Sequence, residues 1–388
     1  MINGHGDDIH NYANVRINFS SNIYAGFSHQ GLYEHLKKSM HLITSYPEPS
    51  PLSLEKSLAE FHGVSCNEIM VTNGATEAIY LIARAFHDYH PVIPQPTFSE
   101  YADACREATT VPDAFPSGSV ASTTVPEAAT VPGELSSASI ASATVPEATT
   151  VPGELSSAPI ASATVPEAFP SGRPSLLTWL CNPNNPTGHV IPKQRLLHDI
   201  ASHPADIFVI DSSYAAYTDQ DTPSALDIVS HDNAIMLCSM TKDYGVPGLR
   251  LGYIIANSRL LERVNSQRMP WSVNTLAIEA GKYLIAHCVE FQFPLATLLA
   301  ERQRMEEEIH EIGILTSHSD SHMLLCQLPN GSARELKDYL ANHHGILIRD
   351  ASNFPTLTQQ HFRIAVQTPD DNNQLISALK NYKSVNCK

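Results

Sequence analysis

The fold is decided by the stretch Ser239-Met240-Thr241-Lys242-Asp243-Tyr244-Gly245-Val246-Pro247-Gly248-Leu249-Arg250. Apolar residues fill positions 234–238 just before it, and a short apolar run without alternation predicts a buried strand. Lys242 therefore follows the end of a strand, in a loop punctuated by Gly and Pro. A lysine there can form a Schiff base with a carbonyl group, and Arg250 can bind a phosphate with its planar guanidinium. Alone, however, Lys242 is more typical of a solvated surface lysine.

The composition predicts a two-domain cytoplasmic enzyme that needs no metal. A chain of 388 residues with 43% hydrophobic content can bury a large core. The formal net charge of -16, without any basic run, argues against nucleic-acid binding. The first residues lack the features of a signal peptide, and no stretch has the roughly 18 uncharged apolar residues of a membrane span. The seven cysteines include no CxxC pair, so neither a disulfide framework nor a zinc site is indicated.

Short apolar runs alternate with helical patterns between residues 69 and 256, which predicts crossover units and a parallel sheet. In such sheets the chemistry gathers beyond the carboxyl ends of the strands. One of these ends, Asn73-Gly74, precedes an apolar helix, so the helix N-terminus there could bind an anion. The residues predicted at strand ends are the Gly74 turn, Phe98, Asn185, Asp211 and Lys242. Their shared placement favours a functional site more strongly than any one of them does.

The domain prediction has three parts and an insert. Residues 1–46 form an N-terminal segment that joins the smaller domain, residues 47–265 form the large domain, and residues 266–388 supply linking helices and a small α/β domain. Residues 111–170 contain three copies of a 20-residue unit rich in Ser, Thr, Ala and Pro, without Lys or Arg. These units have too few large apolar residues for a solenoid. We expect a disordered or loosely extended surface insert without a function of its own.

Two motifs carry a resemblance to a known family. Ser239-x-Thr241-Lys242 with Gly248-Leu249-Arg250-Leu251-Gly252, together with Asn182-Pro-Asn-Asn185-Pro-Thr-Gly188, closely resembles the fold-type I pyridoxal-phosphate enzymes of the class I and II aminotransferase family. The resemblance spans nearly the whole chain except the insert. It implies an α/β fold in which a large domain with a mostly parallel seven-stranded sheet is joined to a smaller α/β domain.

Within that family the sequence is similar to two groups, L-threonine-O-3-phosphate decarboxylases and histidinol-phosphate aminotransferases. The stretches at 270–274 and 345–355 and the opening His5-Gly6 look more like the decarboxylases. Tyr214 is a departure, because the resemblance implies phenylalanine there in the decarboxylases and tyrosine in the aminotransferases. A third alternative, a pyridoxal-phosphate-sensing transcription regulator, would require a DNA-binding module ahead of the fold, and the acidic charge argues against it.

The resemblance implies a role for each residue around the cofactor ring. Lys242 would hold pyridoxal 5′-phosphate covalently and then act as the acid or base at the substrate's α-carbon. Asp211 would pair with the pyridinium nitrogen and keep it protonated, which makes the ring an electron sink. Asn185 and Tyr214 would hydrogen-bond the ring hydroxyl, and Phe98 would stack on the ring.

The resemblance also implies how the phosphate groups and the substrate are bound. The cofactor phosphate would be held by the backbone N–H groups of Ala75 and Thr76, by Ser239 and Arg250, and by Tyr46 of a neighbouring subunit, which implies a homodimer. Arg363 would bind the α-carboxylate of the substrate, and Arg349, Asn22 and His5 are candidates for the substrate's own phosphate. The expected reaction is decarboxylation of L-threonine phosphate to (R)-1-aminopropan-2-yl phosphate; the alternative is transamination.

Overall fold

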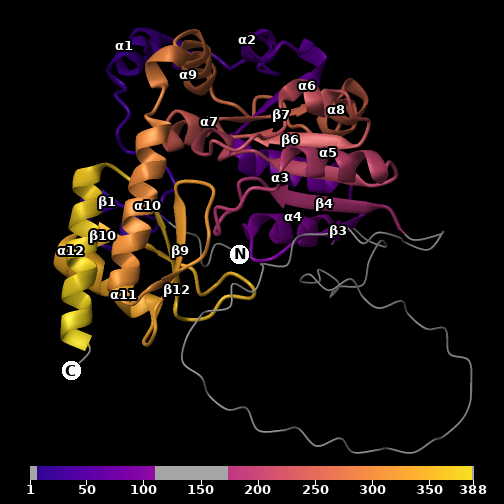
Figure 1. Cartoon of the computed structure of the whole chain (residues 1–388). Coiled ribbons are helices and arrows are strands. Elements are labelled where there is room, and N and C mark those ends of the chain that lie inside the picture. Colours follow the sequence, from indigo (N-terminus) through magenta and orange to yellow (C-terminus); the bar gives the residue numbers. More distant parts are fainter. Residues whose placement is uncertain (1–6, 110–173, 387–388) are drawn as a thin grey trace, which may run out of the picture.

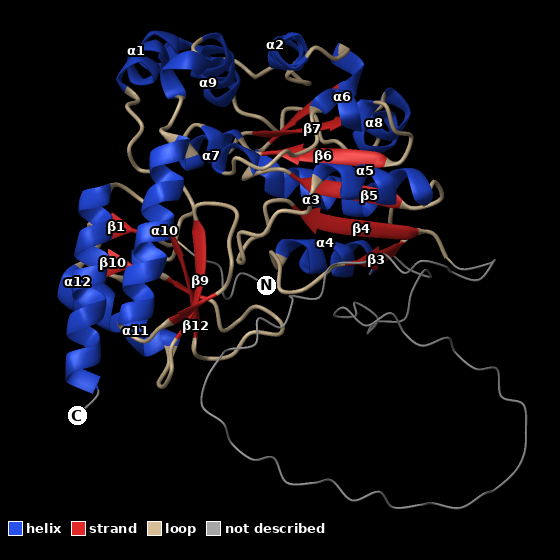
Figure 2. Cartoon of the chain, in the orientation of Figure 1, coloured by secondary structure: helices blue, strands red, loops and turns tan. Residues whose placement is uncertain are grey.

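The computed structural model describes residues 7–109 and 174–386 (Figure 1). His5 and the repeat insert at 111–170, for which the sequence made predictions, lie outside these residues. Helices and strands alternate along most of the described chain. The elements fall into a large sheet with helices on both faces and a smaller C-terminal sheet, which Figure 2 shows as separate groups of red strands.

The large sheet has six strands in the order β2-β7-β6-β5-β4-β3. The strands are β2 (Ile69–Thr72), β3 (His90–Val92), β4 (Leu176–Cys181), β5 (Ile207–Asp211), β6 (Ala234–Cys238) and β7 (Gly252–Ala256). Strand β7 runs antiparallel to both of its neighbours, and the pairs formed by β3, β4, β5 and β6 are parallel. The predicted mostly parallel α/β sheet is thus confirmed; seven strands were expected, and the described residues contribute six.

Both faces of this sheet are buried under helices, which explains why its strands show no alternation of apolar and polar residues. In β5 the side chain of Val209 belongs to one apolar cluster, and those of Phe208 and Ile210 belong to another, because successive residues of a strand face opposite sides. The first cluster includes residues of α3 (Gly74–Ala85), α4 (Glu100–Thr109) and α8 (Ser258–Asn265). The second includes residues of α2 (Leu52–His62), α5 (Lys193–Ser202), α6 (Ala225–Val229) and α9 (Thr275–Ala286).

The smaller sheet is antiparallel and has the order β11-β12-β9-β8. Its strands are β8 (Leu315–Thr316), β9 (Met323–Gln327), β11 (Arg349–Asp350) and β12 (His361–Ala365). The helices of this region are α10 (Leu295–Glu311), α11 (Ala333–Tyr339) and α12 (Pro369–Asn386), seen beside β9 and β12 in Figure 1. The apolar run at 346–348 predicts a strand, and the structure has β10 (Ile346–Leu347) there, which pairs with a strand of the N-terminal segment; β11 is a separate strand that pairs with β12.

The N-terminal segment crosses between these parts. Its strand β1 (Ile17–Asn18) pairs in parallel with β10, and its helix α1 (Gln30–Ser39) lies beside α9 in Figure 1. The boundaries of the three predicted domains stay a prediction. In the described part of the chain no single helix is long and apolar enough to cross a membrane; the bent pair Thr275–Ala286 and Cys288–Glu311 meets the criteria only by length and composition.

Candidate active site

One cavity collects most of the residues that the sequence singled out. From the large sheet and its helices come Ala75, Thr76, Phe98, Asn185, Asp211 and Tyr214, together with Ser239, Lys242 and Arg250; from the N-terminal segment and the smaller sheet come Asn22, Arg349 and Arg363. The cavity lies beyond the carboxyl ends of β4, β5 and β6, as the rule for parallel sheets predicts. Tyr46 does not line the cavity of its own chain and is 86% exposed.

Lys242 lies on α7 (Met240–Asp243), the short helix that follows β6. Its Nζ donates a hydrogen bond to the carbonyl oxygen of Ser21 at 3.0 Å, and its own carbonyl accepts one from Tyr217 OH at 2.8 Å. Burial, and next the positive charge of Arg363, lower the pKa of the Lys242 amine to about 8. A substantial fraction of this amine is therefore neutral at mildly alkaline pH, which is the nucleophilic form.

Asp211 ends β5, and its two carboxylate oxygens accept hydrogen bonds from different donors. Tyr101 OH donates to Oδ2 at 2.6 Å and the backbone N–H of Ser213 donates to Oδ1 at 3.0 Å. Tyr101 is fully buried, and its ring stacks on Trp179 with centroids 5.3 Å apart. Burial, followed by the charge of Asp211, raises the pKa of Tyr101 well above its ordinary value, so the phenol stays a donor. Nothing in the sequence distinguishes Tyr101 from an ordinary core tyrosine, so its contact with Asp211 could not be predicted.

The start of α3 and the end of the 239–250 stretch form a narrow cradle. Gly74 has φ 76°, and a Cβ there would lie 2.6 Å from Arg250 Nη2. A Cβ at Gly252 would lie 2.6 Å from the backbone nitrogen of Ala75. Both glycines are thus required for the guanidinium and the first N–H groups of α3 to come together. This donor set at a helix N-terminus suits a phosphate group.

Two buried arginines face the cavity from neighbouring strands. Arg349 and Arg363 are directly opposite each other in the β11–β12 ladder, 7% and 2% exposed. Arg363 donates to Asn185 Oδ1 and to the Ser20 carbonyl, both at 2.6 Å, and Arg349 donates to Asn353 Oδ1 at 2.8 Å. Burial lowers the pKa of both guanidiniums, that of Arg363 to about 9. Like charges opposite each other in a ladder are unfavourable, so this pair favours an anionic ligand between them.

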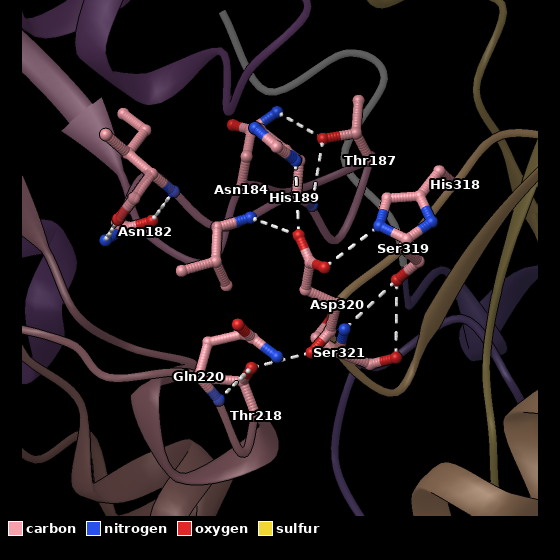
Figure 3. A network of polar contacts seen from close by, with 12 residues as sticks. Asn182, Asn184, Thr187, His189, Thr218, Gln220, His318, Ser319, Asp320 and Ser321 are labelled. Carbon is pink, nitrogen blue, oxygen red and sulfur yellow. Dashed lines mark hydrogen bonds and ion pairs between the residues drawn. The ribbon is translucent and has the colours of Figure 1, made fainter. Parts of the chain in front are cut away.

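The loop at 182–190, which carries Asn185, is fastened to the C-terminal part of the chain, and Figure 3 shows His189 of this loop in contact with Asp320. Asp320 donates its backbone N–H to the Gly188 carbonyl at 3.0 Å, and its carboxylate accepts from the Val190 N–H at 2.9 Å. Burial raises the pKa of Asp320, but hydrogen bonds from His189, Val190 and His318 outweigh it and hold the pKa at about 2. The loop that carries Asn185 is therefore positioned by contacts from both sheets.

Several buried polar atoms of the cavity lack a protein partner. Among the described residues, Asn22 Oδ1, Thr241 Oγ1 and Arg363 Nε are buried without a hydrogen bond. Unsatisfied groups of this kind are rare in native proteins and call for a ligand or water. A cavity with a lysine of lowered pKa, a phosphate cradle, a buried carboxylate and the ring of Phe98 fits a planar phosphorylated cofactor with a carbonyl group.

The comparisons with known proteins agree with this arrangement. The family model "Aminotransferase class I and II" matches residues 14–125 and 166–379. The crystal structure of L-threonine-O-3-phosphate decarboxylase from Porphyromonas gingivalis is similar with a TM-score of 0.79 and 32% identity, over 95% of this chain and 100% of that one. Threonine-phosphate decarboxylase of Salmonella typhimurium is 25% identical over 97% of this chain and 96% of its own length. Histidinol-phosphate aminotransferase of Caldanaerobacter subterraneus subsp. tengcongensis is 27% identical over 88% and 85%, respectively.

Fold and site together define an enzyme that uses pyridoxal 5′-phosphate. The chain belongs to the class I and II aminotransferase family. The family contains both decarboxylases and aminotransferases among the relatives of this chain, so membership alone leaves the reaction open.

Proposed function

We propose that this enzyme decarboxylates L-threonine O-3-phosphate to (R)-1-aminopropan-2-yl phosphate, a step of cobalamin biosynthesis. The observation that carries the proposal is the Arg349–Arg363 pair across the β11–β12 ladder. Two guanidiniums side by side suit a short substrate with two anionic groups close together. L-Threonine phosphate has its carboxylate and its phosphate on adjacent carbons. Arg363 would bind the carboxylate and Arg349 the phosphate, each through a planar fork.

The cofactor-binding roles are part of the same proposal. Lys242 would hold the cofactor covalently, Asp211 would face the ring nitrogen, and Phe98 would lie against the ring. Asn185 and Tyr214 would bind the ring hydroxyl. The cofactor phosphate would occupy the cradle formed by Ala75, Thr76, Ser239 and Arg250, and Tyr46 of a second subunit would reach it. The bound cofactor takes up the electron pair of the bond that breaks at the substrate's α-carbon.

The choice of bond depends on how the chain orients the substrate. Only a bond perpendicular to the cofactor ring overlaps the π system, so a decarboxylase must place the carboxylate there and an aminotransferase must place the C–H bond there. Arg363 would bind the α-carboxylate of any amino-acid substrate, so it does not decide between the two reactions. A phosphate held by Arg349, with Asn22 and His5 as further candidates, would fix the far end of a short substrate close to the ring. Binding the phosphate in this way would fix the rotation of the substrate about the bond between its α-carbon and its nitrogen.

Lys242 would supply the proton transfers at the α-carbon. Its pKa of about 8 allows both the charged and the neutral form near physiological pH. Carbon dioxide leaves with no proton, so the α-carbon must gain one, and the Lys242 ammonium is the proposed donor. The 3.0 Å hydrogen bond to the Ser21 carbonyl holds the amine in place between these transfers.

Transamination remains the second candidate because of Tyr214 and the histidinol-phosphate aminotransferase relatives. Histidinol phosphate is longer and has no carboxylate, so it would leave one of the two arginines to take the phosphate alone. We also infer that the enzyme works as a homodimer in the cytoplasm on small amino-acid phosphates, without nucleic-acid or membrane partners.

The reaction can be tested directly. The purified holoenzyme is incubated with L-threonine phosphate alone, and in parallel with histidinol phosphate and 2-oxoglutarate. Release of carbon dioxide is measured in the first reaction and glutamate in the second. We expect carbon dioxide from L-threonine phosphate without any oxo acid. Glutamate formed with histidinol phosphate, together with no carbon dioxide from L-threonine phosphate, would overturn the proposal in favour of transamination.

A further inference from the structure

Asn22 and Tyr214 contact each other inside the cavity. The resemblance implied separate roles for them, Asn22 at the substrate's phosphate and Tyr214 at the ring hydroxyl of the cofactor. Asn22 Nδ2 donates a hydrogen bond to Tyr214 OH at 3.0 Å. The two residues are 4% and 6% exposed. Asn22 comes from the N-terminal segment after β1, whereas Tyr214 follows β5. One of the two N–H groups of the Asn22 amide is therefore used by the protein itself.

The backbone around Asn22 is anchored inside the cavity. Asn22 has φ 55°, a left-handed conformation that asparagine tolerates better than most residues. The two preceding carbonyl groups are also held inside the site: Ser20 O accepts from Arg363 and Ser21 O accepts from Lys242. Residues 20–22 thus form one wall that is anchored to three proposed active-site residues.

The Asn22 hydrogen bond determines what the Tyr214 hydroxyl can do. A phenol has one proton to donate and can also accept. Because Asn22 occupies an acceptor position, the Tyr214 proton remains available, and no group among the described residues accepts it. Burial raises the pKa of Tyr214 above its ordinary value, so the phenol keeps this proton at working pH.

We propose that Asn22 is a positioning residue for Tyr214, whose phenol proton it directs toward the ring oxygen of the cofactor. This rests on the proposed cofactor site and gives Asn22 a second role beside the substrate phosphate. A hydrogen bond donated to an oxygen stabilises its ionised form. The pair should therefore lower the pH at which the visible absorbance of the bound cofactor changes. The opposite orientation of the Asn22 amide would accept the Tyr214 proton and have the opposite effect.

The test is a double-mutant cycle read by spectroscopy. Asn22→Gly keeps the left-handed backbone and removes the amide, and Tyr214→Phe removes the hydroxyl. Both variants and the double variant are loaded with pyridoxal phosphate, and the pH midpoint of the visible absorbance change is measured. We expect Tyr214→Phe to raise the midpoint by about one unit and Asn22→Gly by about half a unit. The double variant should match Tyr214→Phe alone, because the amide acts through the phenol.

Controls separate this role from folding and from catalysis. Asn11→Gly changes the same residue type in the same segment, where the amide contacts Asp8, and should leave the midpoint unchanged. Asn22→Asp replaces the donor by an acceptor and should raise the midpoint more than Asn22→Gly. If the melting temperature of the cofactor-free protein shows that Asn22→Gly does not fold, the Asn22→Asp variant takes its place in the test. A midpoint that is unchanged or lowered in these Asn22 variants, or shifts that add fully in the double variant, would overturn the inference. Failure of the proposed reaction would appear separately, as absent carbon dioxide with a normal absorbance band.

Discussion

Asp211 shows how a single residue is prepared for its role by neighbours that carry no obvious signal. Its two hydrogen bonds, from Tyr101 and the Ser213 backbone, fix the plane of a carboxylate at the end of β5. Tyr101 itself is held by stacking on Trp179. In the role proposed for Asp211, the carboxylate would therefore not have to be reoriented to meet a protonated ring nitrogen, and such preorganisation lowers the free-energy cost of reorganisation during a reaction.

Removing the Tyr101 hydroxyl should weaken cofactor binding without disturbing the core. Tyr101→Phe keeps the ring that packs on Trp179 and leaves Asp211 Oδ2 without its 2.6 Å partner. We expect the dissociation constant for pyridoxal phosphate, measured by absorbance titration, to rise about fivefold to tenfold. Tyr80→Phe is the matched control, since Tyr80 OH also donates to a carboxylate, that of Glu100, at 3.0 Å. Equal dissociation constants for the two variants would show that Tyr101 is only a packing residue.

The lowered pKa of Lys242 predicts a particular pH dependence. Only the neutral amine attacks a carbonyl carbon, and a pKa of about 8 makes the neutral fraction rise about tenfold between pH 7 and pH 9. The rate at which cofactor-free enzyme captures pyridoxal phosphate should follow this rise and level off above pH 9. A simple alkylamine in the same buffers should keep rising.

Borohydride reduction of the loaded enzyme and peptide mapping should place the pyridoxyl group on Lys242. Lys242→Ala should abolish turnover, while the phosphate cradle can still bind the cofactor. A pyridoxyl group on another lysine, or a capture rate that continues to rise to pH 10.5, would contradict the assignment.

At the scale of elements, two loops fit together only because residue 188 is glycine. Gly188 has φ 73°, and a Cβ there would lie 2.0 Å from Ser319 Oγ. The same loop carries Asn185 and is tied to Asp320 as Figure 3 shows. The close approach joins the large sheet to the loop before β9. A larger residue at position 188 would have to separate them or distort the loop that presents Asn185.

Two glycine variants can measure how much the close contact between these two loops limits the size of residue 188. Gly63 ends α2 with φ 69°, and a Cβ there would meet nothing within 4 Å. Gly63→Ala should therefore cost only the left-handed strain, about 1 kcal/mol in the free energy of unfolding. Gly188→Ala adds overpacking and should cost about 1–3 kcal/mol more. Ser319→Ala in the Gly188→Ala background should restore part of the loss. Equal costs at the two glycines in urea unfolding would show that the loops separate easily.

The sequence predicts the strands and helices of the large sheet well, but it predicts the contacts between distant elements poorly. Asp211, Lys242 and the Gly74 turn could be placed together because carboxyl ends of parallel strands share an edge. Tyr101 and Asp320 act through contacts with residues far away in the chain, which leave no periodicity to detect. The short strand β11 (Arg349–Asp350) was also missed, because two charged residues after an apolar run do not show the pattern of a strand.

At the scale of the whole molecule, the N-terminal segment connects the two sheets through the active site. Phe19 donates its N–H to the Leu347 carbonyl and accepts at its own carbonyl from the Ala365 N–H, so the segment first follows the C-terminal strands. It then passes Lys242 and Arg363 with the carbonyls of Ser21 and Ser20. That the N-terminal segment joins the small domain stays a prediction, and the segment contributes Asn22 directly to the cavity.

Tyr46 and Trp271 form an exposed aromatic pair on the surface of the chain. Tyr46 is 86% and Trp271 is 50% exposed, with ring centroids 5.7 Å apart, and Met269 nearby in the chain is 65% exposed. Trp271 also has φ 60°, an uncommon conformation for a bulky residue. Exposed apolar groups gathered in one place mark interaction surfaces. A second copy of the chain is the partner that the proposed role of Tyr46 requires.

Subunit mixing can establish whether Tyr46 acts across a dimer. The native protein should have a mass in solution twice that of the 42.4 kDa chain. Lys242→Ala chains should be inactive, and Tyr46→Phe chains should lose about tenfold in cofactor affinity, one charge-assisted hydrogen bond to phosphate. When the two variants are mixed and allowed to exchange, each mixed dimer has one site with Lys242 from one chain and Tyr46 from the other. At limiting cofactor the activity should therefore rise above that of either variant, toward half of the native value per mixed dimer. No gain after exchange has been verified by mass would show that Tyr46 does not serve the neighbouring site.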